Sequence, residues 1–519
     1  MDTKALRQKI LDLAIRGKLV PQDPNDEPAE VLLERIREQK QQMFKEGKLK
    51  KKDIKNDTII FKGEDNLHYE KLQDGTVKCI EDEIPFEVPE GWAWCKLNDI
   101  YNFIDYRGAT PTKITNGIPL VTAKNVKSGY IDYTIDDYIS EEEFKERQQR
   151  GISKKGDILF TTEAPLGNAA LADMEKFSAG QRLITFQQYG SKNELINYVM
   201  LMFILSDFFQ QQLYVNKTGS TVAGIKAAIL KTLWIPVPPY NEQLRISNTL
   251  KSAINLIDSI SKNKEILSTS ISNTKSKILD LAIRGKIVPQ DPNDEPASVL
   301  LERIRAEKEE LIKQGKIKRD KKESVIFKGD DNSYYEKIGN KVNCIDEEIP
   351  FELSEGWAFI RLKTAWELIS GRDLSPSEYN DKNDGIPYIT GASNFRNGHI
   401  SLVRWTTVPQ VITRRGDLLL TCKGTIGEIA HNNFGEAHIA RQIMAIRNIY
   451  SLNVDFLALC IEYSMTKIKQ AAKGLIPGIS REDILNLVIP IPPTKEQENI
   501  CNKLKTTFSA IEHIEKSLN

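Results

Sequence analysis

Apolar residues in the middle of the chain are separated by alternating steps of four and three residues. This is the heptad pattern of a helix that packs along a partner helix. It begins after Pro238-Pro239 and ends before Gly285, a typical residue for terminating a helix. We therefore expect a helix over roughly 241–284, about 65 Å long at 1.5 Å per residue. Its seam is formed by Ile246, Leu250, Ala253, Ile257, Ile260, Leu267, Ile271, Ile278 and Leu281, with Lys264 and Thr274 as polar exceptions.

The partner helix is expected from the two ends of the chain. The heptad pattern returns after Pro492-Pro493 and continues in the first residues of the sequence. Together the two ends nearly reproduce the central segment, so we predict a pseudo-twofold arrangement. In it the central helix lies antiparallel to a helix that is split between the termini. The alternative is two unrelated amphipathic helices. The seam positions at the ends are Ile500, Leu504, Thr507, Ile511, Ile514, Leu518, Leu6, Ile10 and Leu13.

The chain is a tandem repeat. Residues 9–37 recur at 277–305 with two differences. Four further pairs keep the same order: IPFEVPEGWAW and IPFELSEGWAF, NGIPLVTAKN and DGIPYITGAS, KGDILFTTEAPLG and RGDLLLTCKGTIG, LWIPVPPYNEQLRI and LVIPIPPTKEQENI. The stretches between these anchors diverge strongly. Neutral drift after a duplication would not spare one segment and change the next, so we favour two equivalent scaffolds that hold two different recognition surfaces.

A second helix is expected in each copy. The turn QDPNDEPA supplies Asp26 or Glu27 as a cap and places Pro28 at the first helical position. The helix should run to about Glu46 and end at Gly47, and its counterpart should run from Pro296 to Gly315. Each helix leads into a lysine-rich run, at 45–55 and 313–323. Such runs are usually solvated, but contact with a phosphate backbone is the alternative.

The remaining segments predict an α+β fold. Residues 57–238 and 324–492 alternate short β-like runs, punctuated by Gly and Pro, with helical pieces. We expect two mixed α/β domains joined by long antiparallel helical spacers with internal-repeat symmetry. The expected ranges are 1–56 for an N-terminal helical arm, 57–238 for the first α/β domain, 239–323 for the central spacer, 324–492 for the second α/β domain and 493–519 for the C-terminal spacer.

Composition limits the possible classes of protein. The 519 residues carry 72 Lys and Arg against 72 Asp and Glu, so any nucleic-acid contact requires charges that are sorted between faces. No apolar stretch approaches membrane-spanning length, and the charged N-terminus is not a secretory signal. The six Cys form no C-x-x-C pair, which favours reduced thiols and a cytoplasmic location. The five His form no cluster with zinc-ligand spacing, so no metal site is expected.

Three motifs with a catalytic appearance are better explained by structure. The V-P-P-Y at 237–240 has Val where amino-methyltransferases need Asp or Asn, so it indicates the start of a helix. The segment 219–226 has Ile225 inside what would be a phosphate-binding G-K-[S/T], which favours a loop beside a binding surface. Asp157 and Glu163 lack the E-x-K half of a nuclease signature, and Gly156-Asp157 is typical of a turn that opens a strand.

The repeated segments resemble the specificity subunit of Type I restriction-modification systems. The resemblance covers the whole chain and rests on DLAIRGKLVPQDPNDEPAEVLLERIR, IPFEVPEGWAWCKL and IPVPPYNEQLRI together with their second copies. It implies that 57–238 and 324–492 are target recognition domains, each reading one half of a split site in double-stranded DNA. It also implies that the helices set the gap and dock two methylation subunits, with restriction and translocase subunits in the full complex. S-adenosylmethionine, ATP and Mg²⁺ would then act in partner subunits, and this chain would have no catalytic residue and no cofactor.

Base readout needs donors and acceptors on loops, and phosphate contact needs basic groups. Side-chain chemistry and loop position, without help from the family, give these candidates for DNA contact in the first domain: Lys124, Asn125, Lys127, Thr162, Asn168, Arg182, Lys217, Thr218, Ser220, Thr221 and Lys226. In the second domain they are Thr390, Ser393, Asn394, Arg396, Arg414, Arg415, Lys423, Thr425, Arg441, Gln442, Lys473, Ser480 and Arg481.

Two other classes of function remain open at this point. The chain could be a helical scaffold that assembles protein partners, or a nuclease or methyltransferase with an unrecognised site. An enzyme would show activity as a single chain. A DNA reader should lose affinity steeply as salt concentration rises, whereas a protein scaffold should lose much less.

Overall fold

The computed structural model describes residues 2–55, 57–106, 110–134, 137–147, 151–189, 194–219, 223–317, 323–396, 398–450, 452–471 and 478–518. The chain divides into two compact units, Met1–Lys264 (unit 1) and Glu265–Asn519 (unit 2). The boundary falls inside the long helix α9 (Tyr240–Ile283), which matches the central helix expected over 241–284. Among the described residues, no helix is both long enough and apolar enough to cross a bilayer.

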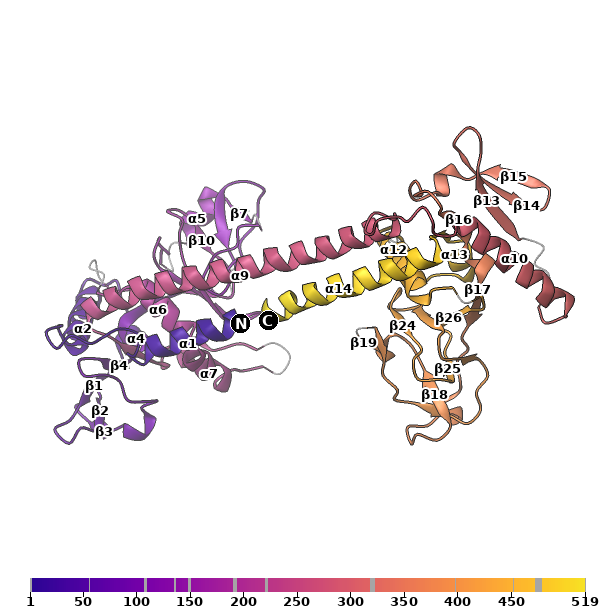
Figure 1. The fold of residues 1–519 in the computed structure, drawn as a ribbon. Coiled ribbons are helices and arrows are strands. Elements are labelled where there is room, and N and C mark those ends of the chain that lie inside the picture. The colour runs from indigo at the N-terminus through magenta and orange to yellow at the C-terminus, as the bar shows by residue number, and fades with distance from the viewer. Residues whose placement is uncertain are drawn as a thin grey trace. The chain divides into compact units, whose positions relative to one another are not determined.

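In unit 1 the N-terminal helix packs antiparallel to the first part of α9 (Figure 1). Arg7, in α1 (Thr3–Ile15), forms an ion pair with Asp258. Further along the chain, Asp26 pairs with Arg245 at 2.5 Å. From Arg7 to Asp26 the residue numbers rise, while those of their partners in α9 fall from 258 to 245. The two segments therefore run in opposite directions. This is the local arrangement that the split seam predicts.

Unit 2 shows the same relation between the last part of α9 and α14 (Thr494–Leu518), which lie side by side in Figure 1. Lys275 pairs with Glu515 at 2.8 Å, while Lys495 approaches Asp294 at 3.9 Å. These two pairs again fix an antiparallel direction. The continuation of the split helix from one terminus to the other remains a prediction.

The predicted seam is only partly buried. Ile246, Leu250, Ile257, Ile271, Ile500 and Leu504 are buried, whereas Ile260, Ile278, Leu281 and Ile511 are half-buried. Leu267 and Ile514 are 40% and 50% exposed, so neither is a core residue of its unit, and the side chain of Leu518 lies outside the described residues. An α-helix drifts by about 20° per heptad relative to a strict seven-residue repeat. Accordingly, Ile254 and Leu279 turn toward the cores instead.

The second helix of each copy is α2 (Ala29–Lys45) or α10 (Ala297–Lys313). Each ends before a glycine with positive φ, Gly47 or Gly315, as predicted. The predicted start was wrong by one residue, because Pro28 is the N-cap and α2 begins at Ala29. The reason is the extended backbone of Pro28, whose ψ of 144° is not helical. The Ala29 N–H, free at the start of the helix, donates to the Gly91 carbonyl at 2.8 Å.

Each unit contains a small three-stranded antiparallel sheet and a larger four-stranded sheet. The small sheets have the orders β1-β2-β3 and β13-β14-β15, and the larger ones β5-β11-β8-β9 and β17-β26-β23-β24. In unit 2 the small sheet lies at one end of the unit and the strands β18 and β25 at the other (Figure 1). The matching strand orders confirm that the repeated anchors build the same α+β frame twice.

The strands of unit 1 are β1 (Ile59–Lys62), β2 (His68–Lys71), β3 (Val77–Cys79), β4 (Ala93–Lys96), β5 (Tyr101–Asp105), β6 (Ile118–Val121), β7 (Tyr138–Ile139), β8 (Ile158–Thr162), β9 (Leu166–Leu171), β10 (Ser178–Ala179), β11 (Leu183–Gln188) and β12 (Trp234–Val237). Its other helices are α3 (Lys51–Ile54), α4 (Leu97–Ile100), α5 (Glu141–Arg147), α6 (Asn197–Ile204), α7 (Asp207–Val215) and α8 (Ala227–Leu230), with a 3-10 turn η1 (Glu81–Glu83).

The strands of unit 2 are β13 (Ser324–Lys328), β14 (Tyr334–Ile338), β15 (Lys341–Cys344), β16 (Ala358–Arg361), β17 (Trp366–Ser370), β18 (Ile386–Ile389), β19 (Phe395–Arg396), β20 (His399–Ile400), β21 (Trp405–Thr406), β22 (Ile412–Thr413), β23 (Leu418–Thr421), β24 (Ile429–His431), β25 (Ala437–Ile439), β26 (Ile443–Asn448) and β27 (Val488–Ile491). Its other helices are α11 (Leu362–Ala365), α12 (Val454–Ala471) and α13 (Arg481–Leu485), with 3-10 turns η3 (Asp346–Glu348), η4 (Pro376–Glu378) and η5 (Ala392–Asn394).

One buried hydrogen bond ties the long helices to the sheets in both units. The Trp92 indole donates to the Glu242 carboxylate at 2.9 Å, and the Trp357 indole donates to the Glu496 carboxylate at the same distance. Both glutamates lie in the first turn of their helix, directly after the Pro-Pro pairs. The V-P-P-Y segment is therefore a helix start, as the sequence predicted.

The turn at Gly156-Asp157 opens β8 as expected, and it predicts a pH-dependent stability. The Asp157 carboxylate is 7% exposed and accepts hydrogen bonds from the Lys154 N–H and the Gln187 amide, both at 2.7 Å. Burial nevertheless raises the pKa of Asp157 to about 6. The folded state thus binds this proton more tightly than the unfolded chain, where the pKa is about 3.9. We expect the contribution of Asp157 to the free energy of unfolding to be fully present below pH 4 and to be lost, by about 2–3 kcal/mol, as pH rises through 6.

Urea titrations from pH 4 to 8 measure this loss of unfolding free energy. The equivalent turn in unit 2 suggests a variant that should abolish it. There the equivalent Asp417 is held by the Arg447 guanidinium at 2.8 Å instead of by an amide. Gln187→Arg should lower the pKa of Asp157 and flatten the pH profile. A profile that Asp157→Asn leaves unchanged would show that another group titrates.

Candidate nucleic-acid interface

Three separate segments meet along one edge of unit 1. The Thr162 N–H donates to the Arg182 carbonyl at 2.9 Å, and the Ile225 N–H donates to the Thr162 carbonyl at 3.0 Å. These two bonds join the β8–β9 hairpin, the turn before β11 and the segment before α8. We call the residues 162–166, 180–182 and 224–226 the loop edge of unit 1.

Unit 2 builds the same edge from equivalent residues. The Cys422 N–H donates to the Gln442 carbonyl at 2.8 Å, and the Ile479 N–H donates to the Cys422 carbonyl at 2.9 Å. The loop edge of unit 2 therefore consists of 422–426, 440–442 and 478–481. In both units the joining bonds are made by backbone groups, so the exposed side chains at the edge can change without breaking these bonds.

The side chains on the two edges differ at matched positions. Arg182 in unit 1 corresponds to Gln442 in unit 2, Glu163 corresponds to Lys423, and Lys226 corresponds to Ser480. All except Glu163, which is half-buried, are exposed. Exchange of donors and acceptors on a constant backbone is what reading two different base sequences requires.

Exposure sorts the predicted contact residues into four groups. The exposed candidates are Lys124, Arg182, Thr218, Lys226, Ser393, Arg396, Arg414, Arg415, Lys423, Thr425, Arg441, Gln442, Ser480 and Arg481. The half-buried candidates are Lys127, Asn168, Lys217 and Thr390, and the buried ones are Asn125, Thr162 and Asn394. Ser220, Thr221 and Lys473 lie outside the described residues.

The three buried candidates are corrected by the structure, because their side chains already have partners inside it. Asn125 accepts from the Thr122 N–H at 2.9 Å, and Asn394 accepts from the Thr390 N–H at 3.0 Å. The two asparagines close equivalent turns in the two units. Thr162 donates its hydroxyl to the Arg182 carbonyl at 3.2 Å. These side chains therefore support the frame.

Not every exposed candidate lies on a loop edge. Arg414 and Arg415 precede β23, while Lys423 follows it, so the two arginines lie at the opposite end of this strand. Arg414 approaches Glu436 at 3.9 Å. Arg396 lies on the short strand β19, which belongs to a separate two-stranded sheet. These three arginines are therefore not brought together with the rest.

The structure also adds residues to the edges that the sequence did not single out. In unit 1, Gln181 lines a cavity of about 180 Å³ together with Lys124 and Arg182. In unit 2 the loop after β17 joins the edge, because Asp373 pairs with Arg441 at 2.7 Å and Ser370 accepts from Arg481 at 3.2 Å. The available signal was that the loops after β5 and β17 diverge between the copies.

Ion pairs on the edges leave basic groups accessible. Arg182 pairs with Glu163 at 3.2 Å, but both side chains are about half exposed. Such solvent-exposed pairs are worth little and can open at small cost. Within the described ranges, no three His, Cys, Asp or Glu side chains are grouped so that they could hold a metal ion. The chemistry of the edges is thus hydrogen bonding and charge.

Comparisons with known proteins place this arrangement among its relatives. The sequence matches the family described as Type I restriction modification DNA specificity domain over residues 89–268 and 354–519. It is 27% identical to the Type I restriction enzyme EcoAI specificity subunit of Escherichia coli, over 97% of this chain and 90% of that protein. It is 26% identical to the EcoEI specificity subunit of Escherichia coli, over 99% of this chain and 90% of that protein.

Similarity also extends to a solved structure. A chain from the work described as "Structural basis underlying complex assembly and conformational transition of the type I R-M system" has a TM-score of 0.59 with this chain. The match covers 84% of this chain and 94% of that one, with 19% identity. At that identity the likeness shows a shared fold.

Proposed function

Since the chain belongs to the Type I restriction-modification DNA specificity family and has its DNA-specificity role, we propose that each unit reads one half of a split DNA site. The observation that carries this proposal is the pair of loop edges. They share a backbone frame but present different side chains, such as Arg182 and Gln442 at one matched position. A single chain with two such loop edges can therefore recognise two different DNA sequences.

In this proposal the long helices set the separation of the two DNA-reading units and contact partner subunits. A half-site pair with a fixed gap needs its two readers at a fixed separation, and α9 is a continuous helix of 44 residues. Its exposed apolar residues, such as Leu256 at 62% and Ile266 at 54%, are suited to contact with partner subunits. We propose two methylation subunits as these partners, which would carry the S-adenosylmethionine chemistry. Restriction and translocase subunits would add ATP and Mg²⁺ chemistry, and this chain would supply recognition without catalysis.

Modified-base sequencing of host DNA tests the proposal. With the gene intact, we expect methyladenine in a two-part motif with a fixed, non-specific gap, and we expect its loss when the gene is deleted. Alanine at Lys124, Arg182 and Lys226 should relax the sequence of one half only, because a bidentate base contact contributes about 1–3 kcal/mol of discrimination. Alanine at Lys423, Arg441 and Gln442 should relax the other half only.

Arg414→Ala combined with Arg415→Ala is the matched control, since these exposed arginines lie away from the loop edge of unit 2. This variant should leave both halves of the motif unchanged. If methylation in the host is unaffected by deletion of the gene, co-expression with a methylation subunit on a fresh plasmid provides the decisive assay. Absence of any split motif there would contradict the proposal.

A further inference from the structure

Each unit carries a small sheet that precedes the residues matched by the family. The matched regions begin at 89 and 354, while β1–β3 and β13–β15 lie between 59 and 79 and between 324 and 344. The two small sheets pair in the same register, with Phe61 opposite Tyr69 and Phe327 opposite Tyr335. The family's DNA-reading region therefore does not account for this part of the chain.

The surface around the small sheets recurs between the units, in contrast to the loop edges. Val77 and Val342 occupy matched positions and are 50% and 51% exposed. Glu87 and Glu90 recur as Glu352 and Glu355, and all four are exposed. Exposed positions are the ones where a duplicated chain is freest to diverge. Glu30 is an exception, because Ser298 takes its place in unit 2. The exposed residues that do stay the same in both copies fit one kind of partner bound twice.

In unit 1 this surface is hollowed into a groove of about 610 Å³ between β1 and the segment 87–94. Its apolar lining includes Ile60, Phe61 and Val88, and its acidic residues are Glu30, Glu87 and Glu90. The hydrogen bond from the Ala29 N–H to the Gly91 carbonyl holds α2 against one wall. In unit 2 the Ala297 N–H makes the same bond to Gly356, also at 2.8 Å.

The charge of the groove selects the class of partner. Three exposed carboxylates line it, against one lysine, Lys62. In the described part of the chain, Glu30, Glu87 and Glu90 take part in no ion pair at 4.0 Å or less. Such a surface repels a phosphate backbone, so it cannot grip DNA. It fits a polypeptide segment that combines apolar anchors with Lys or Arg.

We propose that this groove and the matching surface of unit 2, which carries Glu352 and Glu355, are the docking sites for one basic, apolar-anchored segment of the methylation subunit, with one copy bound to each unit. This inference rests on the proposed function, which requires two copies of that subunit. It assigns a second contact, required in addition to the one proposed for α9, to a surface apart from the loop edges.

Native mass spectrometry of the complex, purified with its co-expressed methylation subunit, tests the proposal. The wild-type chain should bind two copies. Glu87→Lys with Glu90→Lys should leave one copy, because like charges then face the basic segment. Glu352→Lys with Glu355→Lys should leave the other copy, and the four-residue variant should bind none. Glu87→Gln with Glu90→Gln removes charge without reversal and should weaken the first site at least 10-fold.

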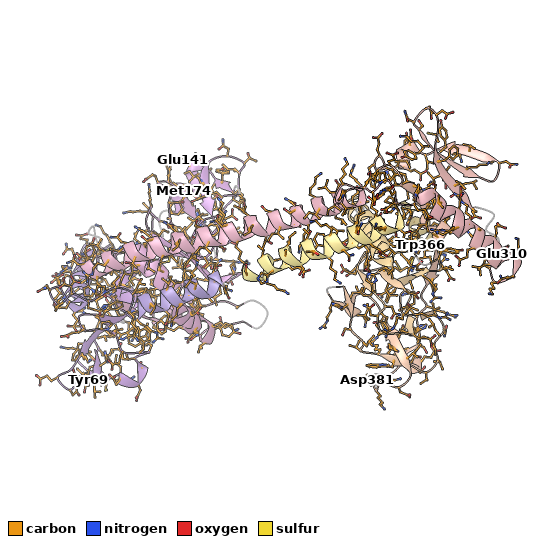
Figure 2. The ribbon with its side chains drawn as sticks, in the orientation of Figure 1. Tyr69, Glu141, Met174, Glu310, Trp366 and Asp381 are labelled. Carbon is orange, nitrogen blue, oxygen red and sulfur yellow. The ribbon has the colours of Figure 1, made fainter. Side chains whose placement is uncertain are left out.

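Asp381→Lys with Asp384→Lys is the matched control. Both residues are exposed, and Asp381 lies at the far end of unit 2 from the small sheet (Figure 2). This double reversal should leave two copies bound. Unchanged melting temperatures would show that the variants fold.

The outcomes separate the inference from the proposed function. If every variant binds two copies of the methylation subunit and the split motif is still methylated, the groove is not the docking site and the proposed function stands. A wild-type chain that binds no methylation subunit would overturn both. Stepwise loss of one copy with each pair of substitutions would support the groove as the docking site.

Discussion

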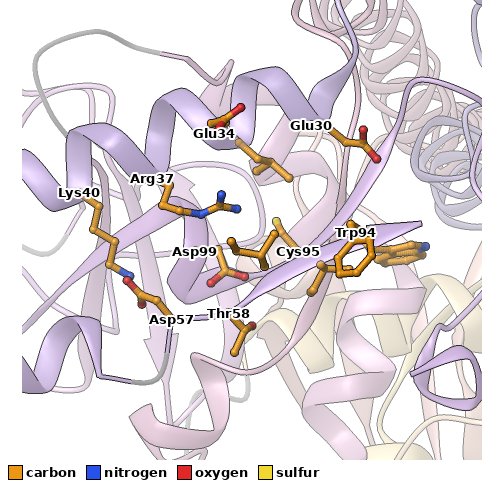
Figure 3. Close-up of a pocket in the computed structure, with 13 residues that line it drawn as sticks. Glu30, Glu34, Arg37, Lys40, Asp57, Thr58, Trp94, Cys95 and Asp99 are labelled. Carbon is orange, nitrogen blue, oxygen red and sulfur yellow. The ribbon is translucent and has the colours of Figure 1, made fainter. Parts of the chain in front are cut away.

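Lys40→Met is expected to destabilise unit 1 by about 3–5 kcal/mol, since it removes one partner of a buried ion pair. The Lys40 ammonium lies 2.6 Å from the Asp57 carboxylate and 2.9 Å from the Asn98 carbonyl. It also lies 4.9 Å from the centre of the Tyr189 ring. Figure 3 shows the side chain reaching from α2 to Asp57. Lys40 is 2% exposed and Asp57 is half-buried, so the substitution leaves a partly desolvated carboxylate without its counter-charge.

Chemical denaturation with hydrogen exchange measures the effect and locates it. Protection should fall first in α2 and in the strands it covers, because Lys40 joins this helix to the chain before β1. Lys48→Met is the control: its ammonium also pairs with a carboxylate, Glu46, at 2.7 Å, but the side chain is 64% exposed. Its loss should cost less than about 1 kcal/mol. Equal effects of the two substitutions would show that the buried pair is not a major contributor.

Arg361→Met is expected to have a similar effect in unit 2. The Arg361 guanidinium is 6% exposed and makes two bonds to the Glu336 carboxylate, at 3.1 and 2.8 Å. It also donates to Glu348 at 2.7 Å and to the Asn486 carbonyl at 2.8 Å. Glu336 is itself buried, so the substitution leaves a carboxylate without its counter-charge. We expect a loss of about 3–5 kcal/mol.

Arg361→Lys provides the matched comparison, because unit 1 has lysine at the equivalent position. There Lys96 pairs with Glu70 at 2.5 Å. The lysine variant keeps the charge but loses the two-pronged geometry, so it should cost only about 1–2 kcal/mol. Urea denaturation of the three proteins gives the order. A methionine variant as stable as the lysine variant would contradict the role assigned to the charge.

Periodicity and repetition made the helices and the fold class predictable. The central helix spans 240–283 against an expected 241–284, because Pro238-Pro239 and Gly285 fix its ends by backbone chemistry that acts locally. The same two signals located α14 and the glycine ends of α2 and α10. The repeat then carried each assignment from one copy to the other.

The candidate site was only partly predictable, because the loop edges form through contacts between distant segments. Thr162 meets Arg182 and Ile225 through backbone bonds that no local pattern encodes. Asn125 and Asn394 have the composition of base-reading residues, yet each closes a turn. The repeat pairs Asn125 with Ser393, so the equivalence of Asn125 and Asn394 emerges only from their hydrogen bonds in the folded units. Leu267 shows the same limit, since a heptad pattern does not reveal where a long helix rotates away from its partner.

The backbone bonds of the loop edges have a consequence for how such proteins diversify. A scaffold held by N–H and carbonyl groups tolerates almost any side chain at the positions it displays, so a substitution at Arg182, Lys226 or Gln442 need not be compensated elsewhere. Mutational robustness and evolvability therefore reside in the same few bonds. New half-site preferences can arise one residue at a time in either unit, with the partner half left intact throughout.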